Sequence, residues 1–151
     1  MALLSSGDQQ KLRDAFSQMT RPVRLLFFTQ TLDCETCLTA RQILDELPPL
    51  SEKISIDEVN LVLDRDKATQ YGIDRAPAVA VLGQEDGGAD GGALRDSRIR
   101  FIGAPAGYEF ISLVQAVLLV GGRPSGLTDE NRARLAEVKQ PVTMQVFTTP
   151  T

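Results

Sequence analysis

An unbroken apolar run, Leu25-Leu26-Phe27-Phe28, constrains the fold more than any other feature of this sequence. Consecutive side chains of an extended segment point to opposite faces, so a strand with this run must be covered on both faces. We therefore expect Val23–Thr29 to be a strand at the centre of a sheet. Arg21-Pro22 separates it from an amphipathic helix predicted over residues 8–19, whose start fits a capping box at Ser6.

The segments that follow alternate between helical and strand patterns. We expect a helix over residues 34–47, a strand over 53–63 parallel to the first, a helix over 64–71, an antiparallel pair of strands over 78–82 and 98–102, and an apolar helix over 107–120. With the helix in front, this order is that of the thioredoxin fold. The predicted fold class is therefore α/β, thioredoxin/glutaredoxin-like, with a central four-stranded mixed sheet flanked by helices.

Composition excludes several function classes. The chain has 151 residues, a net charge of -4 and no cluster of basic residues, which argues against nucleic acid and anionic membranes as partners. It contains no histidine, so Ser-His and Cys-His nucleophile pairs and histidine metal ligands are unavailable to it. The most apolar run, residues 110–120, is shorter than the roughly 20 residues of a membrane span, so we expect no transmembrane segment.

Cys34 and Cys37 are the two cysteines of the chain, and they follow the predicted central strand. Three positions apart, they close a loop too short to restrain an unfolded chain, so they are not a structural staple. Two cysteines without histidine make half of a zinc site, which a dimer would have to complete, and two idle buried thiols are a further alternative. We favour a redox dithiol, because residues i and i+3 at the first turn of a helix bring two sulfurs within bonding distance.

The position of each cysteine predicts its role. Free backbone N–H groups and the helix dipole favour an anion at the first one, so Cys34 should attack a substrate disulfide and Cys37 should resolve the mixed disulfide. Asp33 and Glu35 flank the nucleophile and should oppose its thiolate. A pKa of Cys34 below about 5, typical of strongly oxidising sites, would contradict this expectation.

Pro77 precedes the strand predicted over residues 78–82. In a thioredoxin-like fold the loop ahead of this strand lies beside the dithiol. We therefore expect a cis Ala76-Pro77 bond, which turns the backbone of Ala76 toward a bound substrate chain. Residues 83–97, with glycine pairs at 87–88 and 91–92, are expected to form a mobile, solvated hairpin connection rather than a phosphate loop.

An internal repeat begins near Thr128. A shift of 119 residues aligns five identical pairs: Arg13 with Arg132, Pro22 with Pro141, Val23 with Val142, Phe28 with Phe147 and Thr29 with Thr148. Chance similarity over a short window is the alternative, but the order of helix, proline and apolar strand also recurs. We therefore divide the chain into a thioredoxin-fold unit over residues 1–122 and a linker, helix and first strand of a second unit over 123–151.

The predicted second unit stops about where its own cysteine turn would fall. Its strand, over residues 142–148, lacks neighbours within the chain. We expect this strand either to fray or to pair with an available sheet edge, for example in a symmetric homodimer.

Two stretches carry a family resemblance. Residues 26–37 (LFFTQTLDCETC), together with Ala76-Pro77, resemble the first unit of the glutaredoxin-like protein disulfide oxidoreductases, which fuse two thioredoxin-fold units. Residues 103–114 (GAPAGYEFISLV) and 121–125 (GGRPS) are similar to the N-terminal domain of the alkyl hydroperoxide reductase flavoprotein subunit, which has the same paired architecture. The resemblance implies that Cys34 is the nucleophile, Cys37 the resolving thiol and Pro77 the cis-proline beside them.

The chain also departs from these families. In the flavoprotein-linked branch the first unit has lost its cysteines, so their retention here places the chain nearer the disulfide oxidoreductases. We predict a thiol–disulfide oxidoreductase that exchanges electrons with protein disulfides and an upstream thiol reductant, without metal or organic cofactor. A reducing cytoplasm is the expected compartment, since the N-terminus lacks the features of a signal peptide. The alternative is a non-catalytic or minor-site scaffold that supports a catalytic second unit, as in electron transfer to a peroxide reductase.

Overall fold

The computed structural model describes residues 3–84 and 93–149. Within these ranges one sheet contains the strands β1 (Val23–Thr29), β2 (Ile54–Asn60), β3 (Ala78–Gln84) and β4 (Leu94–Ile102). Their order in the sheet is β2-β1-β3-β4, with β1 parallel to β2 and antiparallel to β3, and β3 antiparallel to β4. The sheet is therefore mixed, and β1 has an inner position, as its apolar run predicts.

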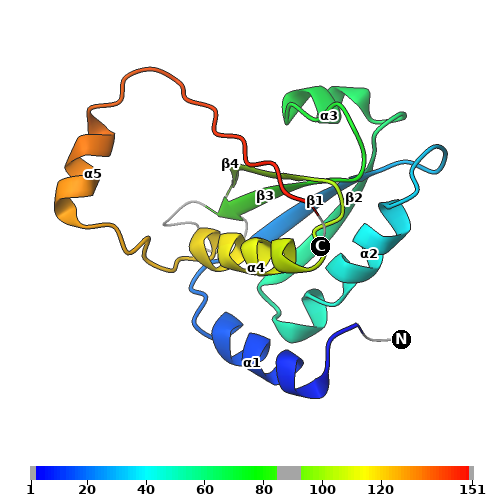
Figure 1. The fold of residues 1–151 in the computed structure, drawn as a ribbon, viewed down its shortest axis with the longest axis horizontal. Helices are drawn as coiled ribbons and strands as arrows, with labels where there is room; N and C mark the ends of the chain where they lie inside the picture. Colours follow the sequence, from blue (N-terminus) through cyan, green and yellow to red (C-terminus); the bar gives the residue numbers. More distant parts are fainter. Residues whose placement is uncertain (1–2, 85–92, 150–151) are drawn as a thin grey trace.

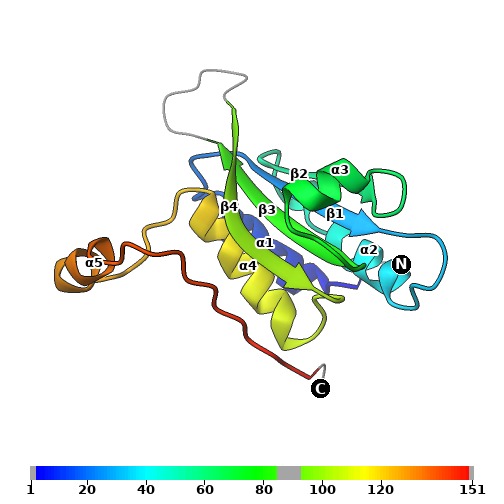
Figure 2. The same cartoon turned by 90° about the horizontal axis from the view of Figure 1, so that it is seen from above.

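Helices cover both faces of this sheet (Figures 1 and 2). On one face lie α1 (Ser6–Phe16), α2 (Cys37–Asp45), the 3-10 turn η1 (Pro48–Leu50) and α4 (Tyr108–Val120), whereas α3 (Arg65–Gln70) lies on the other. A further helix, α5 (Asp129–Ala136), lies apart from the sheet in both views. This arrangement confirms the predicted thioredoxin fold. No helix within the described ranges combines the length and the apolar character needed to cross a membrane.

The core consists of two hydrophobic clusters, one on each face of the sheet. Leu25 and Phe27 of β1 enter the cluster beneath α1, α2 and α4, whereas Leu26 and Phe28 enter the cluster beneath α3. All four side chains are at most 1% exposed. The alternation of these side chains between the two clusters confirms that β1 is covered on both faces. The packing on both faces holds in place the strand that leads into the two cysteines.

The structure corrects the predicted start of the first helix. The helix begins at Ser6, and its N-cap is Ser5 rather than Ser6. Ser5 has an extended backbone, and its hydroxyl oxygen accepts a hydrogen bond from the backbone N–H of Asp8 at 3.1 Å. An N-cap residue needs this non-helical conformation, whereas Ser6 already lies in the helix.

The fourth strand is longer than predicted. It begins at Leu94, four residues ahead of the alternating pattern at 98–102, so part of the predicted connection over 83–97 is strand. An irregularity in the pairing hides this extension: Arg98 has a φ of 64°, and the Ser97 hydroxyl donates to the carbonyl of Val81 at 2.5 Å. Such a bulge interrupts the two-residue alternation by which strands are recognised. Residues 85–92, including the two glycine pairs, lie outside the described ranges.

The segment after α4 forms its predicted helix but not its predicted strand. The N-cap of α5 is Thr128, whose side chain accepts a hydrogen bond from the N–H of Asn131 at 3.2 Å. No residue of α5 is buried. The described part of the following segment, residues 139–149, has no regular secondary structure, and Val142 and Phe147 are 71% and 89% exposed. Residues 142–148 therefore do not form the expected strand in this single chain, and none of the described strands pairs with them.

Candidate redox site

The two cysteines form a disulfide at the start of α2. Their Cα atoms are 5.5 Å apart, the separation expected for a bonded pair. Cys37 is the first residue of α2 and is 6% exposed, whereas Cys34 is half-buried. Cys34 is thus the more accessible of the two to a partner molecule.

The helix that carries the site starts later than predicted. We expected it to begin at Cys34, but Glu35 and Thr36 form a turn and the helix begins at Cys37. Asp33, just ahead, has a φ of 56°, a left-handed conformation that interrupts helical geometry and that Asp tolerates better than most residues. Thr36 is the N-cap but provides no side-chain hydrogen bond, so the first N–H groups of α2 lie beside the disulfide without that cap.

Gln30 holds the loop between β1 and the cysteines. Its side-chain Nε2 donates to the carbonyl oxygens of Leu32 at 2.9 Å and Asp33 at 3.3 Å. The sequence prediction missed this role. A polar residue with two donors at the end of a buried strand is the signal that could have indicated it.

The loop with Pro77 lies at the same end of the sheet as the cysteine loop. In the antiparallel pairing of β1 with β3, Ala78 is opposite Phe28. Pro77 precedes Ala78 directly and therefore lies beside the end of β1. The Ala76-Pro77 peptide bond is cis, as predicted. Pro77 is buried and Ala76 half-buried.

Gly103 connects a third loop to this end of the sheet. It follows β4 directly, and its N–H donates to the carbonyl oxygen of Pro77 at 2.8 Å. Its φ of 102° is open to glycine and strained for other residues. The sequence prediction did not assign Gly103 to the site, although it begins one of the two stretches that carry the family resemblance.

The charged groups near the site are exposed to solvent. The side chains of Asp33 and Glu35 are both exposed, so water screens their effect on the neighbouring cysteine. Arg75, next to Ala76, forms an ion pair with Asp74 through its Nε at 2.8 Å. The hydrogen bond from Arg75 holds the pKa of Asp74 below its ordinary value.

Two large apolar side chains flank the cysteines. Leu32 precedes Cys34 by two residues and is 77% exposed, and Leu38 follows Cys37 and is 68% exposed. Within residues 3–84 and 93–149, no three His, Cys, Asp or Glu side chains gather in the way a metal site requires. The arrangement joins an accessible sulfur, a covered sulfur and apolar surroundings, which suits exchange with the disulfide of another polypeptide.

Comparison with curated proteins finds two kinds of relative, although no protein-family model matches the chain. A probable thioredoxin of Methanothermobacter thermautotrophicus is 28% identical over 82 residues, which make up 54% of this chain and 80% of that protein. The alkyl hydroperoxide reductase AhpF of Xanthomonas campestris pv. phaseoli is 32% identical over 128 residues, 82% of this chain but 19% of that protein.

Comparison with solved structures finds the same fold in two kinds of protein. The NTD_N/C domain of alkyl hydroperoxide reductase AhpF from Enterococcus faecalis matches with a TM-score of 0.76 at 29% identity, over 87% of this chain and 59% of that one. A protein disulfide oxidoreductase from Aeropyrum pernix shares the fold, with a TM-score of 0.72 at 23% identity, over 89% of this chain and 55% of that one. These likenesses confirm the predicted resemblance: the chain is a thioredoxin-fold unit similar to the N-terminal domain of the alkyl hydroperoxide reductase AhpF.

Proposed function

We propose that this protein exchanges electrons with protein disulfides through Cys34 and Cys37. It is a thiol–disulfide oxidoreductase of thioredoxin fold. The bonded pair at the start of α2, with one sulfur-bearing residue half-buried and the other covered, carries the proposal. The similarity to a probable thioredoxin over 80% of that protein supports it.

The reaction follows from the exposure of the two residues. In the reduced protein, the thiolate of Cys34 attacks one sulfur of the substrate disulfide, whose S–S bond breaks as a mixed disulfide forms and the first substrate thiolate leaves. Cys37 then loses its proton and attacks the sulfur of Cys34, which releases the second substrate thiolate. Two electrons pass to the substrate, and the Cys34–Cys37 disulfide remains. An upstream thiol reductant restores the dithiol by the reverse exchange.

Ala76 and Pro77 form the proposed surface for the substrate backbone. The pairing of Ala78 with Phe28 supports this role, because it brings the loop to the end of β1 where the cysteine loop begins. The hydrogen bond from Gly103 to Pro77 holds that loop in place. We expect the backbone of Ala76 to face a polypeptide bonded to Cys34.

Asp33 and Glu35 are proposed to tune the nucleophile. Their negative charges disfavour the thiolate of Cys34 and so make the disulfide less oxidising, since a stabilised reduced form is what makes a disulfide a strong oxidant. Asp33→Asn combined with Glu35→Gln should raise the reduction potential, measured by equilibration with a dithiol of known potential. An unchanged or lower potential would contradict this role.

Disulfide reduction by cysteine variants tests the main proposal. Wild type should reduce insulin disulfides in the presence of a dithiol reductant, and Cys34→Ser should abolish the reaction. Cys37→Ser should accumulate the mixed disulfide with the substrate, because the resolving thiol is missing. Equal turnover by wild type and Cys34→Ser would contradict the proposal. The scaffold role is tested by the same comparison in a two-unit protein that contains a catalytic second unit, where unchanged turnover would favour it.

Compartment, division and partners are further parts of the proposal. Two cysteines as an exchangeable pair suit a glutaredoxin-like protein of the reducing cytoplasm.

We propose that residues 1–122 are the redox unit and that residues 123–151 begin a second thioredoxin-fold unit. The exposed apolar side chains of this second part would contact another polypeptide, including a second copy of the chain. Sedimentation velocity of the full chain tests the homodimer, since a single monomeric species over the micromolar range would exclude it.

A further inference from the structure

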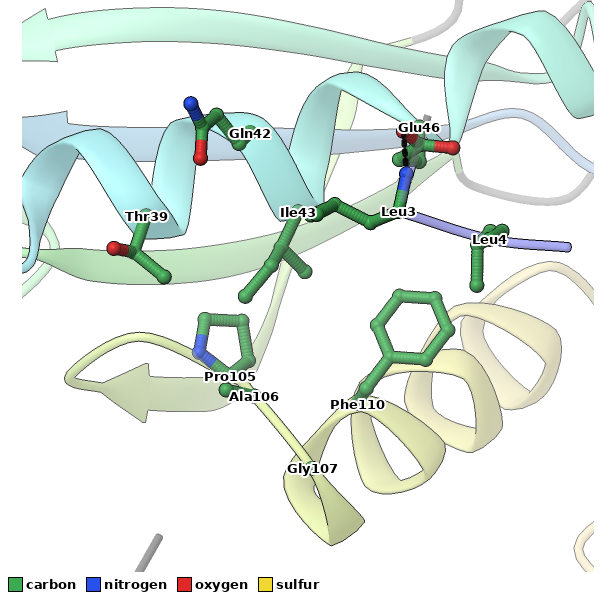
Figure 3. Close-up of a pocket in the computed structure, with 10 residues that line it drawn as sticks. All are labelled: Leu3, Leu4, Thr39, Gln42, Ile43, Glu46, Pro105, Ala106, Gly107 and Phe110. Atoms are coloured by element: carbon green, nitrogen blue, oxygen red, sulfur yellow. Dashed lines mark hydrogen bonds between the residues drawn. The ribbon is translucent and has the colours of Figure 1, made fainter. Parts of the chain in front are cut away.

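An open cavity of about 370 Å³ lies between α2 and the loop that joins β4 to α4. Figure 3 shows Thr39 and Ile43 of α2 on one side of it and Pro105 and Phe110 on the other. Leu3, from the N-terminal segment, lies at the end that is farther from the cysteines. The lining is mainly apolar, which is typical of cavities that bind apolar groups.

Both walls of the cavity begin at the redox site. The helical wall belongs to α2, whose first residue is Cys37, and Thr39 lies two residues further, about 3 Å along the axis. The loop wall continues from Gly103, whose N–H donates to the carbonyl oxygen of Pro77 at 2.8 Å. The cavity therefore lies between two elements that both start at the end of the sheet where the disulfide lies.

The charge of the lining restricts what can enter. Among the described residues that line the cavity, Glu46 carries the one charge, and its Oε1 accepts a hydrogen bond from the N–H of Leu3 at 2.7 Å. An acidic side chain would be repelled there, and any charged group would lose hydration against apolar walls. A large apolar side chain can pack against Ile43 and Phe110 without losing the hydration of a charged group.

We propose that the cavity binds a large apolar side chain of the polypeptide whose disulfide is exchanged. This inference rests on the thiol–disulfide exchange proposed above and adds a selection among its substrates. Ile43 lies six residues beyond Cys37, about 9 Å along the helix axis. The reacting cysteine of the substrate bonds to Cys34, whose Cα lies 5.5 Å from that of Cys37. Since an extended chain advances about 3.3 to 3.6 Å per residue, the bound side chain lies about three or four residues from that cysteine.

The KM values of two matched disulfide peptides test the proposal. The peptides differ in carrying Phe or Ser three residues from the reacting cysteine, and the wild-type KM should be about tenfold lower for the Phe peptide. Thr39→Trp should reduce this ratio to less than about twofold, because the indole fills the cavity entrance. Thr69→Trp is the matched control: the same change at an exposed position of α3, on the opposite face of the sheet, should preserve the tenfold ratio.

The possible results separate the cavity from the chemistry. A wild-type ratio near one, or an equal loss of selectivity in Thr39→Trp and Thr69→Trp, would overturn the proposal. It would also be overturned by a dimer that Thr39→Trp dissociates in sedimentation velocity, because a second copy of the chain would then occupy the cavity. Wild-type reduction of a small aromatic disulfide distinguishes the two proposals. No reduction would contradict the proposed oxidoreductase function, whereas reduction together with a KM ratio near one for the two peptides would contradict only the proposed binding of an apolar side chain in the cavity.

Discussion

Two regions of this chain share a sequence pattern but differ in packing. Val23 and Phe28 of β1 are 1% and 0% exposed, whereas their repeat partners Val142 and Phe147 are 71% and 89% exposed. The preceding helices differ in the same way, since Phe16 of α1 is buried and α5 has no buried residue. The apolar pattern therefore specifies which residues a sheet could cover, and the neighbouring strands decide whether a strand forms.

The largest difference should appear on removal of the aligned phenylalanines. Phe28→Ala removes a buried side chain from the cluster beneath α3 and should lower the free energy of unfolding by about 3–5 kcal/mol. Phe147→Ala removes an exposed one and should change it by less than about 0.5 kcal/mol. Urea denaturation of the oxidised proteins measures both, and similar losses would mean that residues 142–148 are packed in solution.

Two glycines with positive φ give a second contrast. Gly122 has a φ of 109°, and a Cβ atom there would collide with the hydroxyl of Thr20, so Gly122→Ala should destabilise the packed unit by about 1–3 kcal/mol. Gly126 has a φ of 75°, and its Cβ would meet nothing within 4 Å. Gly126→Ala strains the linker alone and should leave the main thermal transition unchanged. A lower Tm in Gly126→Ala would show that the linker is coupled to the packed unit.

The two N-caps provide a smaller contrast. Ser5→Ala removes the side-chain oxygen that accepts from Asp8 and should cost about 1 kcal/mol of global stability, because α1 is packed against the core. Thr128→Ala should reduce the helical signal of α5 in circular dichroism without shifting the urea midpoint. An equal shift of the midpoint in both variants would contradict the separation of the two regions.

The smallest expected effect is electrostatic and belongs to the packed region. Two hydrogen bonds from Arg100, at 2.8 and 2.6 Å, hold the pKa of Asp96 below its ordinary value of 3.8. The carboxylate therefore adds stability above the unfolded-state pKa, and this contribution is lost as the pH falls through the lower folded-state pKa. Because both side chains remain partly exposed, Asp96→Asn should cost less than about 1 kcal/mol at pH 7.

A pH series of urea denaturation checks this prediction. The difference between wild type and Asp96→Asn should shrink as the pH falls below 3.8, because protonation removes the charge in wild type as well. A difference that grows under acid would reverse the assigned sign.

The spacing of apolar residues predicted those helices and strands that form from nearby residues in the sequence. The bounds of β1 match the prediction because four consecutive apolar residues permit one environment, a strand covered on both faces. Contacts distant in sequence were beyond those patterns. The bulge around Arg98 depends on the pairing of β4 with β3, whose register shifts between Ala80 and Leu82. The strand expected at 142–148 depends on neighbours that none of the described strands provides.

The site was predicted where residue type carries the chemistry. Cys34, Cys37 and the Ala76-Pro77 bond were identified from the sequence, and the structure brings their loops to one end of the sheet. The roles of Gln30 and Gly103 were missed although both lie in the stretches that carry the family resemblance, because each acts through a hydrogen bond with backbone that residue type alone does not indicate.

The inner position of β1 also has a consequence for amide exchange with deuterated solvent. Its backbone pairs with β2 on one side and β3 on the other, and both faces are covered, so the amides of Leu26 and Phe28 can exchange only when the sheet opens as a whole. Those amides should be among the slowest to exchange in the chain. The cysteine loop thus extends from one of the two inner strands, so the sulfurs can exchange disulfide partners without any opening of the sheet.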